Sequence, residues 1–166
     1  MSHALIPGSF DPMTLGHLNI IKRTRSYYDK VTVAVMINES KQYRYTLEQR
    51  AAIARLTVGD LPGVEVVTDR GMLVDLFDRI GADVIVKGVR NEVDRVYEEE
   101  MAAFNLERNP RAKTEFLQAA DDYEELNSTM VRELLSKGKS PEGLVAPAAL
   151  AYMEALSLQG GENVRV

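Results

Sequence analysis

The sequence predicts an α/β protein of one domain, in which a doubly wound parallel sheet of five strands carries helices on both faces. Short β-branched runs alternate with longer helical segments, and this order requires crossovers between parallel strands. The length of 166 residues suits a single domain. Hydrophobic residues make up 45% and charged residues 27% of the chain, a balance typical of a globular protein rather than a disordered one.

Five β-rich runs are present, at residues 4–6, 31–37, 64–67, 83–86 and 114–118. The second run is continuous and β-branched, which favours a strand buried on both faces of a parallel sheet. The first run ends at Pro7-Gly8, and the fifth has a weaker β pattern than the others. No internal repeat, linker or low-complexity segment divides the chain. The sheet is therefore expected to be Rossmann-like and to lie within one domain.

Helical segments are expected at about residues 18–28, from 46 onward, and at 72–80, 91–108, 128–138 and 147–158. Thr46-Leu-Glu-Gln49 matches a capping box, and the helix that it opens is expected to bury Ala52, Ile53 and Leu56 on one face. In the long charged segment 91–108, the expected inner stripe is Val93, Val96, Tyr97, Met101 and Phe104. The domain is expected to span residues 1–158, followed by a flexible polar tail at 159–166.

Composition excludes several classes of function. The 20 basic and 25 acidic residues give a net charge of −5, which argues against binding of nucleic acid or a membrane surface through bulk basic charge. The absence of cysteine excludes disulfides, thiolate metal sites and a cysteine nucleophile, and two histidines disfavour an imidazole zinc site. No apolar run is long enough to span a bilayer, and no signal peptide is visible. We therefore expect a soluble, cytoplasmic protein that holds no metal on its own side chains.

The segment after the first strand, Gly8-Ser-Phe-Asp-Pro-Met-Thr-Leu-Gly-His17, leads directly into a helix. Its two glycines allow close backbone approach, and Ser9 and Thr14 offer hydroxyl groups. The free N–H groups of a helix start favour phosphate, and a histidine there can stabilise charge on a transferring phosphoryl group. A helix cap with a merely exposed histidine is the alternative for a lone Gly-Ser loop. The full combination favours a phosphate site.

Polar residues follow the other strands as well, and the carboxyl ends of parallel strands meet at one edge of the sheet. The relevant segments are Ser40-Lys41, Gly71-Met-Leu-Val-Asp75, Lys87-Gly-Val-Arg90 and Tyr123-Glu-Glu-Leu-Asn-Ser-Thr129. Taken singly, each has an ordinary structural explanation: a solvated lysine, a helix start, a basic loop and a helix cap. Together at one edge, they can gather two phosphate groups.

These segments resemble the nucleotidylyltransferase superfamily with the T/H-x-G-H motif and, within it, the bacterial phosphopantetheine adenylyltransferase family. The likeness is carried by Pro7, the loop from Gly8 to His17, Lys41 before T-L-E-x-R, and the later motifs, so it covers nearly the whole chain. It implies reversible transfer of the adenylyl group of ATP to 4′-phosphopantetheine, giving dephospho-coenzyme A and pyrophosphate. This is the penultimate step of coenzyme A biosynthesis.

The resemblance also implies roles for individual residues, with His17 as the stabiliser of the transition state. It implies ATP binding by Ser9, Phe10, His17, Gly88, Val89, Arg90, Glu98, Tyr123, Glu124, Glu125, Leu126, Asn127, Ser128 and Thr129. It implies binding of 4′-phosphopantetheine by Ser9, Lys41, Leu73 and Lys87, with Met72 as a weaker neighbour. The chain departs from the family pattern at Lys87, where the family has arginine, and at Asn127, where it has serine; Lys87 keeps the charge but loses the bidentate fork.

The resemblance further implies Mg²⁺ carried with ATP, feedback binding of coenzyme A, and a homohexamer of two stacked trimers. Composition shows none of these. Two other functions stay open on the residues alone. The acceptor could be nicotinamide mononucleotide, or a glycerol-phosphate-type acceptor of a cytidylyltransferase. Alternatively, the departures at Lys87 and Asn127 fit a nucleotide-binding regulatory module that has lost catalysis.

Overall fold

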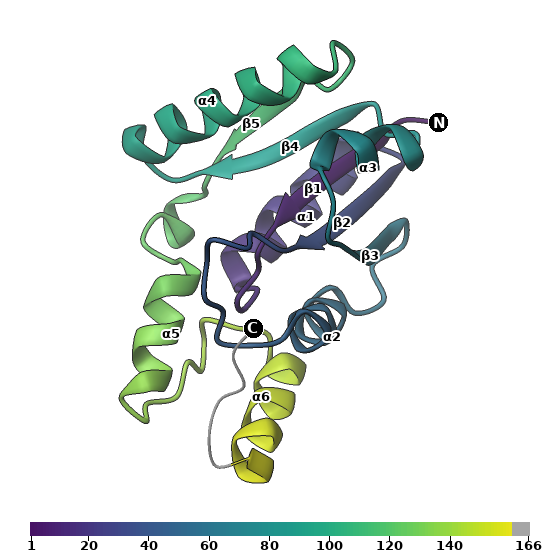
Figure 1. The fold of residues 1–166 in the computed structure, drawn as a ribbon. Helices are drawn as coiled ribbons and strands as arrows, with labels where there is room; N and C mark the ends of the chain where they lie inside the picture. The colour runs from purple at the N-terminus through teal and green to yellow at the C-terminus, as the bar shows by residue number, and fades with distance from the viewer. Residues whose placement is uncertain (161–166) are drawn as a thin grey trace.

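The computed structural model of the chain describes residues 1–160 and contains one sheet of five parallel strands (Figure 1). The strands are β1 (His3–Gly8), β2 (Lys30–Met36), β3 (Val64–Asp69), β4 (Val84–Val89) and β5 (Thr114–Gln118). Their order in the sheet is β3-β2-β1-β4-β5. The predicted fold class, a single-domain Rossmann-like α/β fold, is confirmed.

The helices are α1 (Leu15–Tyr27), α2 (Leu47–Val58), α3 (Leu73–Arg79), α4 (Glu92–Arg108), α5 (Ser128–Ser136) and α6 (Pro147–Gly160), with a short 3₁₀ turn, η1 (Asp121–Tyr123). The predicted capping box is confirmed, since Thr46 and Gln49 exchange hydrogen bonds of 3.1 and 3.0 Å between side chain and backbone. Helix α6 runs two residues past the predicted end of the domain, to Gly160. The rest of the predicted tail, residues 161–166, lies outside the described residues.

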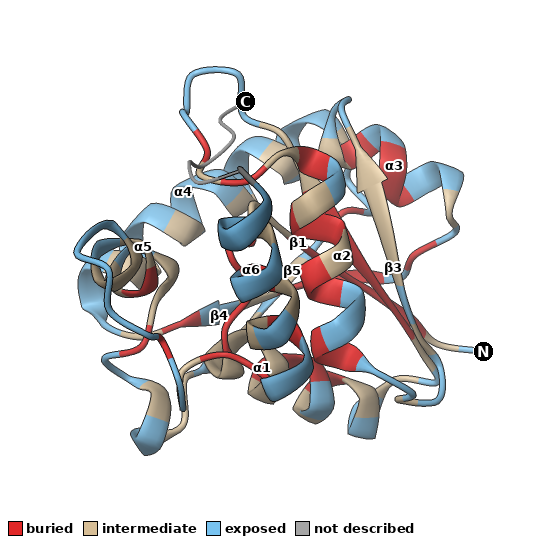
Figure 2. Ribbon diagram, turned by 90° about the horizontal axis from the view of Figure 1, so that it is seen from below, coloured by how far each residue is buried: buried red, intermediate tan, exposed pale blue. Residues whose placement is uncertain are grey.

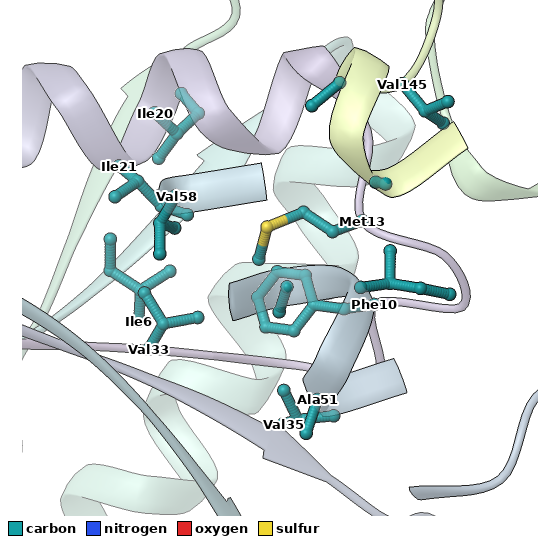
Figure 3. Packing of buried hydrophobic residues seen from close by; sticks show 14 of the residues in the cluster. Ile6, Phe10, Met13, Ile20, Ile21, Val33, Val35, Ala51, Val58 and Val145 are labelled. Carbon is teal, nitrogen blue, oxygen red and sulfur yellow. The ribbon is translucent and has the colours of Figure 1, made fainter. Parts of the chain in front are cut away.

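Alternate residues of the strands face two different layers of helices. On one face, Ile6 and Val33 belong to a cluster that includes Ile20, Ile21 and Ala51 from α1 and α2 (Figure 3). On the other face, the neighbouring residues of the same strands meet α3 in a smaller cluster: Leu5, Ala34, Ile85, Val74 and Phe77. Figure 2 shows the buried residues concentrated between these layers.

The strand order places a switch point beside β1. The chain moves outward from β1 to β2 and β3, then returns to the other side of β1 and continues outward through β4 and β5. In open parallel sheets, ligands bind beyond the carboxyl ends of the strands at such a point. The loop after β1 therefore lies where a ligand is expected.

The predicted apolar face of α2 is confirmed at Ile53 and wrong at Leu56, and the predicted inner stripe of α4 was wrong. In α2, Leu56 is 39% exposed, and the buried face is formed by Ala51, Ile53, Ala54 and Val58. In α4, all of whose residues are described, none is buried, and Val93 and Tyr97 are 81% and 58% exposed. Helix α4 packs against β4, next to the edge strand β5, and has α3 as its helical neighbour. Three side chains of the expected stripe, Tyr97, Met101 and Phe104, line a cavity instead of a core.

Two strand ends also differ from the expected ones. Strand β1 continues through Pro7 and Gly8, which pair with Ala34 and Val35 of β2. Strand β4 continues through Val89, so that Lys87 and Gly88 lie within the strand and not in the loop after it. The cause is the register with β5, which aligns Lys87 with Phe116 and prolongs β4 by three residues.

Candidate active site

A cavity of about 830 Å³ lies at the switch point and brings most of the predicted site residues together. Its lining includes Ser9, Phe10, His17, Lys41, Met72, Leu73, Lys87, Gly88, Glu98, Ser128 and Thr129. These residues come from six segments that lie far apart in the sequence. The expectation that the strand ends share one cleft is met.

Other predicted ATP-binding residues do not line this cavity. Val89 and Leu126 are buried, whereas Glu124 and Glu125 are exposed. Asn127 caps α5, because its Oδ1 accepts the backbone N–H of Met130 at 2.8 Å. Tyr123 packs against the protein core. Arg90 lies just outside the cavity lining, with its guanidinium 3.3 Å from the carboxylate of Asp94.

The loop after β1 is fixed by hydrogen bonds from two sides. The carboxylate of Asp11 accepts the backbone N–H groups of Arg44 and Tyr45 at 2.8 and 3.1 Å. From α5, Arg132 donates to the Asp11 carbonyl at 2.9 Å, and Ser128 donates to the Pro12 carbonyl at 2.8 Å. The start of α5 is thereby held against the start of α1, which brings two helix N-termini to one cavity.

Phe10 has an unusual backbone, with φ at 48° in the left-handed region, and its side chain is buried. A Cβ atom at Gly8 would lie 2.8 Å from the Phe10 ring, so only glycine fits there. Phe10 and Met13 both point into the hydrophobic cluster (Figure 3). The loop is thus anchored in the core while its backbone stays at the cavity.

The hydrogen bonds of His17 determine which ring nitrogen carries the proton. The backbone N–H of Thr14 donates to Nδ1 of His17 at 2.9 Å, and a backbone amide cannot accept in return. Nδ1 is therefore unprotonated, and the neutral ring carries its proton on Nε2. Burial, Lys87 and Arg90 together lower the pKa of His17 to about 4, so the ring is neutral at pH 7. The Phe10 ring meets the His17 ring edge-on at 5.0 Å between centroids.

Lys87 and Arg90 each have a carboxylate partner on α4, which is Glu98 for Lys87 and Asp94 for Arg90. Nζ of Lys87 lies 2.8 Å from Oε2 of Glu98, and both side chains are largely shielded from solvent. Lys41 is exposed on the far side of the cavity, after β2. Within residues 1–160, no group of three or more acidic or imidazole side chains is arranged to hold a metal ion. The cavity thus combines Lys41, Lys87 and the N-termini of α1 and α5.

Sequence reasoning missed several residues of the site. Tyr97, Met101 and Asn105 of α4 line the cavity, although the first two were assigned to an inner stripe. Arg50, fully buried in α2, donates to the Ser9 carbonyl at 2.7 Å. Two local signals mark it: it is the arginine of the T-L-E-x-R motif, and it lies three residues before buried Ile53, on the buried face of the helix.

Comparisons with known proteins give a consistent relationship. The model of the cytidylyltransferase-like family matches residues 5–134. A phosphopantetheine adenylyltransferase of Limosilactobacillus reuteri is 44% identical over 138 residues, which cover 83% of this chain and 80% of the relative. One of Symbiobacterium thermophilum is 43% identical over 147 residues, 89% of this chain and 91% of the relative.

Similarity to a solved structure supports the fold and nothing beyond it. A putative nicotinate-nucleotide adenylyltransferase from Vibrio parahaemolyticus superposes with a TM-score of 0.69 over 93% of this chain and 99% of that chain, at 19% identity. Among the helices of residues 1–160, none combines the length and the apolar character that a membrane crossing requires.

Proposed function

This chain belongs to the phosphopantetheine adenylyltransferases of the cytidylyltransferase-like family, and we propose that it transfers the adenylyl group of ATP reversibly to 4′-phosphopantetheine. The products are dephospho-coenzyme A and pyrophosphate. One observation carries the mechanism: His17, Lys41, Lys87 and the start of α5 line a single cavity, although they come from distant segments. That arrangement suits a reaction between two polyanions.

In the proposed reaction, a phosphate oxygen of 4′-phosphopantetheine attacks the α-phosphorus of ATP in line. The new P–O bond forms as the bond to the bridging oxygen of pyrophosphate breaks, and the electron pair leaves with pyrophosphate. The nucleophile is already an anion at neutral pH, so the reaction requires no general base. Catalysis then consists of aligning the groups and stabilising charge on the five-coordinate phosphorus.

The proton on Nε2 suits His17 for this task. A neutral imidazole with Nδ1 already occupied by the Thr14 N–H can donate from Nε2 to a nonbridging oxygen of the α-phosphate. The donor is ready at pH 7 because the pKa of about 4 keeps Nδ1 free of a proton. We assign His17 the role of transition-state stabiliser.

The cations and hydroxyl groups divide between the two substrates. Lys41, Lys87 and Ser9 are proposed to orient the attacking phosphate, because the two cations lie on opposite sides of the β1 loop. Arg90, with Ser128 and Thr129 at the start of α5, is proposed to hold the triphosphate of ATP.

Magnesium is proposed to arrive with ATP, where it would neutralise charge on the phosphates. The carboxylates nearest the site are engaged already: Glu98 with Lys87, Asp94 with Arg90, and Asp11 with two backbone amides. The side chains therefore fit a metal held mainly by the substrate. The pantetheine arm is proposed to extend between α3 and α4, along Leu73 and Met101, which line the same cavity.

Three further properties belong to the same proposal. Coenzyme A contains the pantetheine phosphate and adenylyl parts of the product, so it is proposed to bind the same cavity as a feedback ligand. The exposed apolar side chains Val93 and Val96 on α4 support assembly into the expected homohexamer. We place the protein in the cytoplasm, where its substrate ATP is available.

The decisive test mixes the purified protein with Mg-ATP and 4′-phosphopantetheine and measures dephospho-coenzyme A by mass. Nicotinamide mononucleotide and nicotinate mononucleotide with Mg-ATP, and glycerol 3-phosphate with Mg-CTP, serve as competing reactions, with pyrophosphate release as the common readout. We expect pyrophosphate release only when 4′-phosphopantetheine is the acceptor. Turnover with another acceptor would assign a different substrate, and calorimetric ATP binding without any turnover would favour a regulatory module.

A further inference from the structure

Arg50 is a buried cation that the proposed mechanism does not use. Its side chain is fully buried in α2, and among residues 1–160 it forms no ion pair with a carboxylate. Burial lowers its pKa from the ordinary value of an arginine. Burying a charge without a counter-ion is unfavourable by several kcal/mol. An apolar residue would fill a helix face more favourably, so the position requires another explanation.

The guanidinium donates to backbone carbonyls from three segments that meet at the cavity. Nη1 donates to the Ser9 carbonyl at 2.7 Å and to the Met36 carbonyl at 3.0 Å, and Nε donates to the Tyr45 carbonyl at 3.3 Å. The group also stacks on the Tyr43 ring at 3.9 Å. Ser9 follows β1, Met36 ends β2, and Tyr45 precedes the capping box of α2. Arg50 therefore joins the ends of two neighbouring strands.

The bond to Ser9 determines the direction of the next amide. The Ser9–Phe10 peptide is trans, so its C=O and N–H point in opposite directions. Because the carbonyl points to Arg50, the Phe10 N–H points away from it. This N–H has no acceptor among the described residues, and both residues of the peptide line the cavity. The left-handed backbone of Phe10 is unfavourable for phenylalanine and persists only if its surroundings hold it.

We propose that Arg50 is a positioning residue for adenylyl transfer: it holds the Ser9–Phe10 peptide so that the Phe10 N–H donates to a nonbridging oxygen of the α-phosphate. This inference rests on the proposed function. It gives the α-phosphate two fixed donors, this amide and Nε2 of His17, whose ring lies against that of Phe10. Two such donors at one centre form the arrangement that stabilises developing charge in acyl and phosphoryl transfer.

The test compares Arg50→Gln and Arg50→Lys with a matched control, Arg55→Gln. Arg55 lies in the same helix but is exposed, and it makes one hydrogen bond of 3.3 Å, to the Val66 carbonyl. We expect kcat of Arg50→Gln to fall about 30- to 100-fold, less than for removal of a donor because the Phe10 N–H remains but is no longer held, with KM for both substrates changed less than threefold. Arg50→Lys retains a charged donor and should recover part of kcat; Arg55→Gln should match the wild type.

A sulfur substitution separates positioning from a general loss of structure. ATP carrying sulfur at one nonbridging oxygen of the α-phosphate exists as two diastereomers. Fixed donors should make the wild type prefer one of them, and Arg50→Gln should reduce that preference at least fivefold. If Arg50→Gln does not fold, Arg50→Lys carries the same test, with a smaller reduction.

The outcomes distinguish this inference from the function on which it rests. A wild type that forms dephospho-coenzyme A, together with Arg50 variants that keep kcat within threefold or keep the wild-type diastereomer preference, overturns only the positioning role. A wild type that forms no product overturns the proposed function, and the role of Arg50 in adenylyl transfer with it.

Discussion

The backbone N–H of Thr14 lies 2.9 Å from Nδ1 of His17, and this one hydrogen bond leaves Nε2 as the donor of the ring. Thr14 is the N-cap of α1, so the same contact that starts the helix also sets the tautomer of the site. Capping and chemistry are thus performed by the same pair of residues, and the histidine is restrained before any substrate binds.

Replacing His17 by alanine should lower kcat about 10²- to 10³-fold, because a donor to the developing charge is removed. KM for ATP should change much less, since the bond strengthens mainly in the transition state. Steady-state kinetics with pyrophosphate release measures both constants. Lys22→Gln, an exposed change in the same helix, is the control. Turnover within threefold of the wild type would remove His17 from the mechanism.

His17 should also make the stability of the substrate-free protein depend on pH. Its folded pKa of about 4 is below the unfolded value of 6.5, so the unfolded chain binds more protons between these values. The contribution of His17 is therefore complete above about pH 6.5 and is lost as pH falls toward 4. The ring is partly exposed in the open cavity, and solvent there reduces the effect to about 1 to 2 kcal/mol.

Urea unfolding at pH 7.5 and 4.5 measures this dependence in the wild type and in His17→Gln. The other histidine, His3, also has a lowered pKa, but it is present in both proteins and cancels in the comparison. We expect the wild type to lose about 1 to 2 kcal/mol more than the variant on acidification. Equal losses in the two proteins would show that His17 titrates normally in the folded state.

The ion pair between Lys87 and Glu98 makes a specific prediction about acceptor binding. Lys87→Gln should raise KM for 4′-phosphopantetheine about 20- to 100-fold, because it removes a cation and leaves Glu98 facing the phosphate. Adding Glu98→Gln removes that repulsion, so the double variant should recover about three- to tenfold. Lys87→Arg should remain within threefold of the wild type. A double variant that is no better than Lys87→Gln would mean that Glu98 does not face the acceptor.

The shared location of Ser9, His17 and Lys41 could be predicted because each lies in a segment that follows a strand in a simple alternation of strands and helices. Parallel strands bring such loops to one edge whatever the details of packing, so Ser9, His17 and Lys41 were placed together from their order alone. The capping box of α2 is likewise a local signal within four residues.

Features that depend on distant partners could not be predicted in this way. Helix α4 has the periodicity of a buried helix, but its stripe faces a cavity at the edge of the sheet, so Tyr97 and Met101 line the site instead of a core. The bond between Arg50 and Ser9 spans 41 residues, and although each residue lies in a recognisable motif, neither motif indicates that the two residues meet. Lys87 lies inside β4 because of a register with β5 that only the assembled sheet defines.

Lys41 should contribute to binding and not to folding. It is exposed and carries no ion pair within residues 1–160, so Lys41→Gln should change the free energy of unfolding by less than about 0.5 kcal/mol. The same change should raise KM for 4′-phosphopantetheine about 5- to 20-fold through loss of a charged hydrogen bond. Lys22→Gln again provides the control. An unchanged KM would place the acceptor phosphate away from the loop after β2.

Substitution of Gly88 distinguishes two reasons for a glycine at this position: close packing of α1 against β4, and room for ATP. A Cβ atom there would lie 2.9 Å from Cγ1 and 3.1 Å from Cδ1 of Ile20, so glycine allows α1 to approach β4 closely. Gly88→Ala should therefore destabilise the fold by about 1 to 3 kcal/mol through overpacking. Combining it with Ile20→Val removes Cδ1 and should restore about half of the loss, as measured by urea unfolding. Ile20→Val alone is the control, with an expected loss of about 0.5 to 1.5 kcal/mol.

Activity at saturating substrate then decides between the two roles. If packing is the reason for glycine, kcat of Gly88→Ala should recover together with stability in the double variant, because the start of α1 carries His17 and moves with the helix. If the backbone at Gly88 must instead be open for ATP, the double variant should regain stability while KM for ATP stays raised. The close approach of Ile20 favours the first outcome.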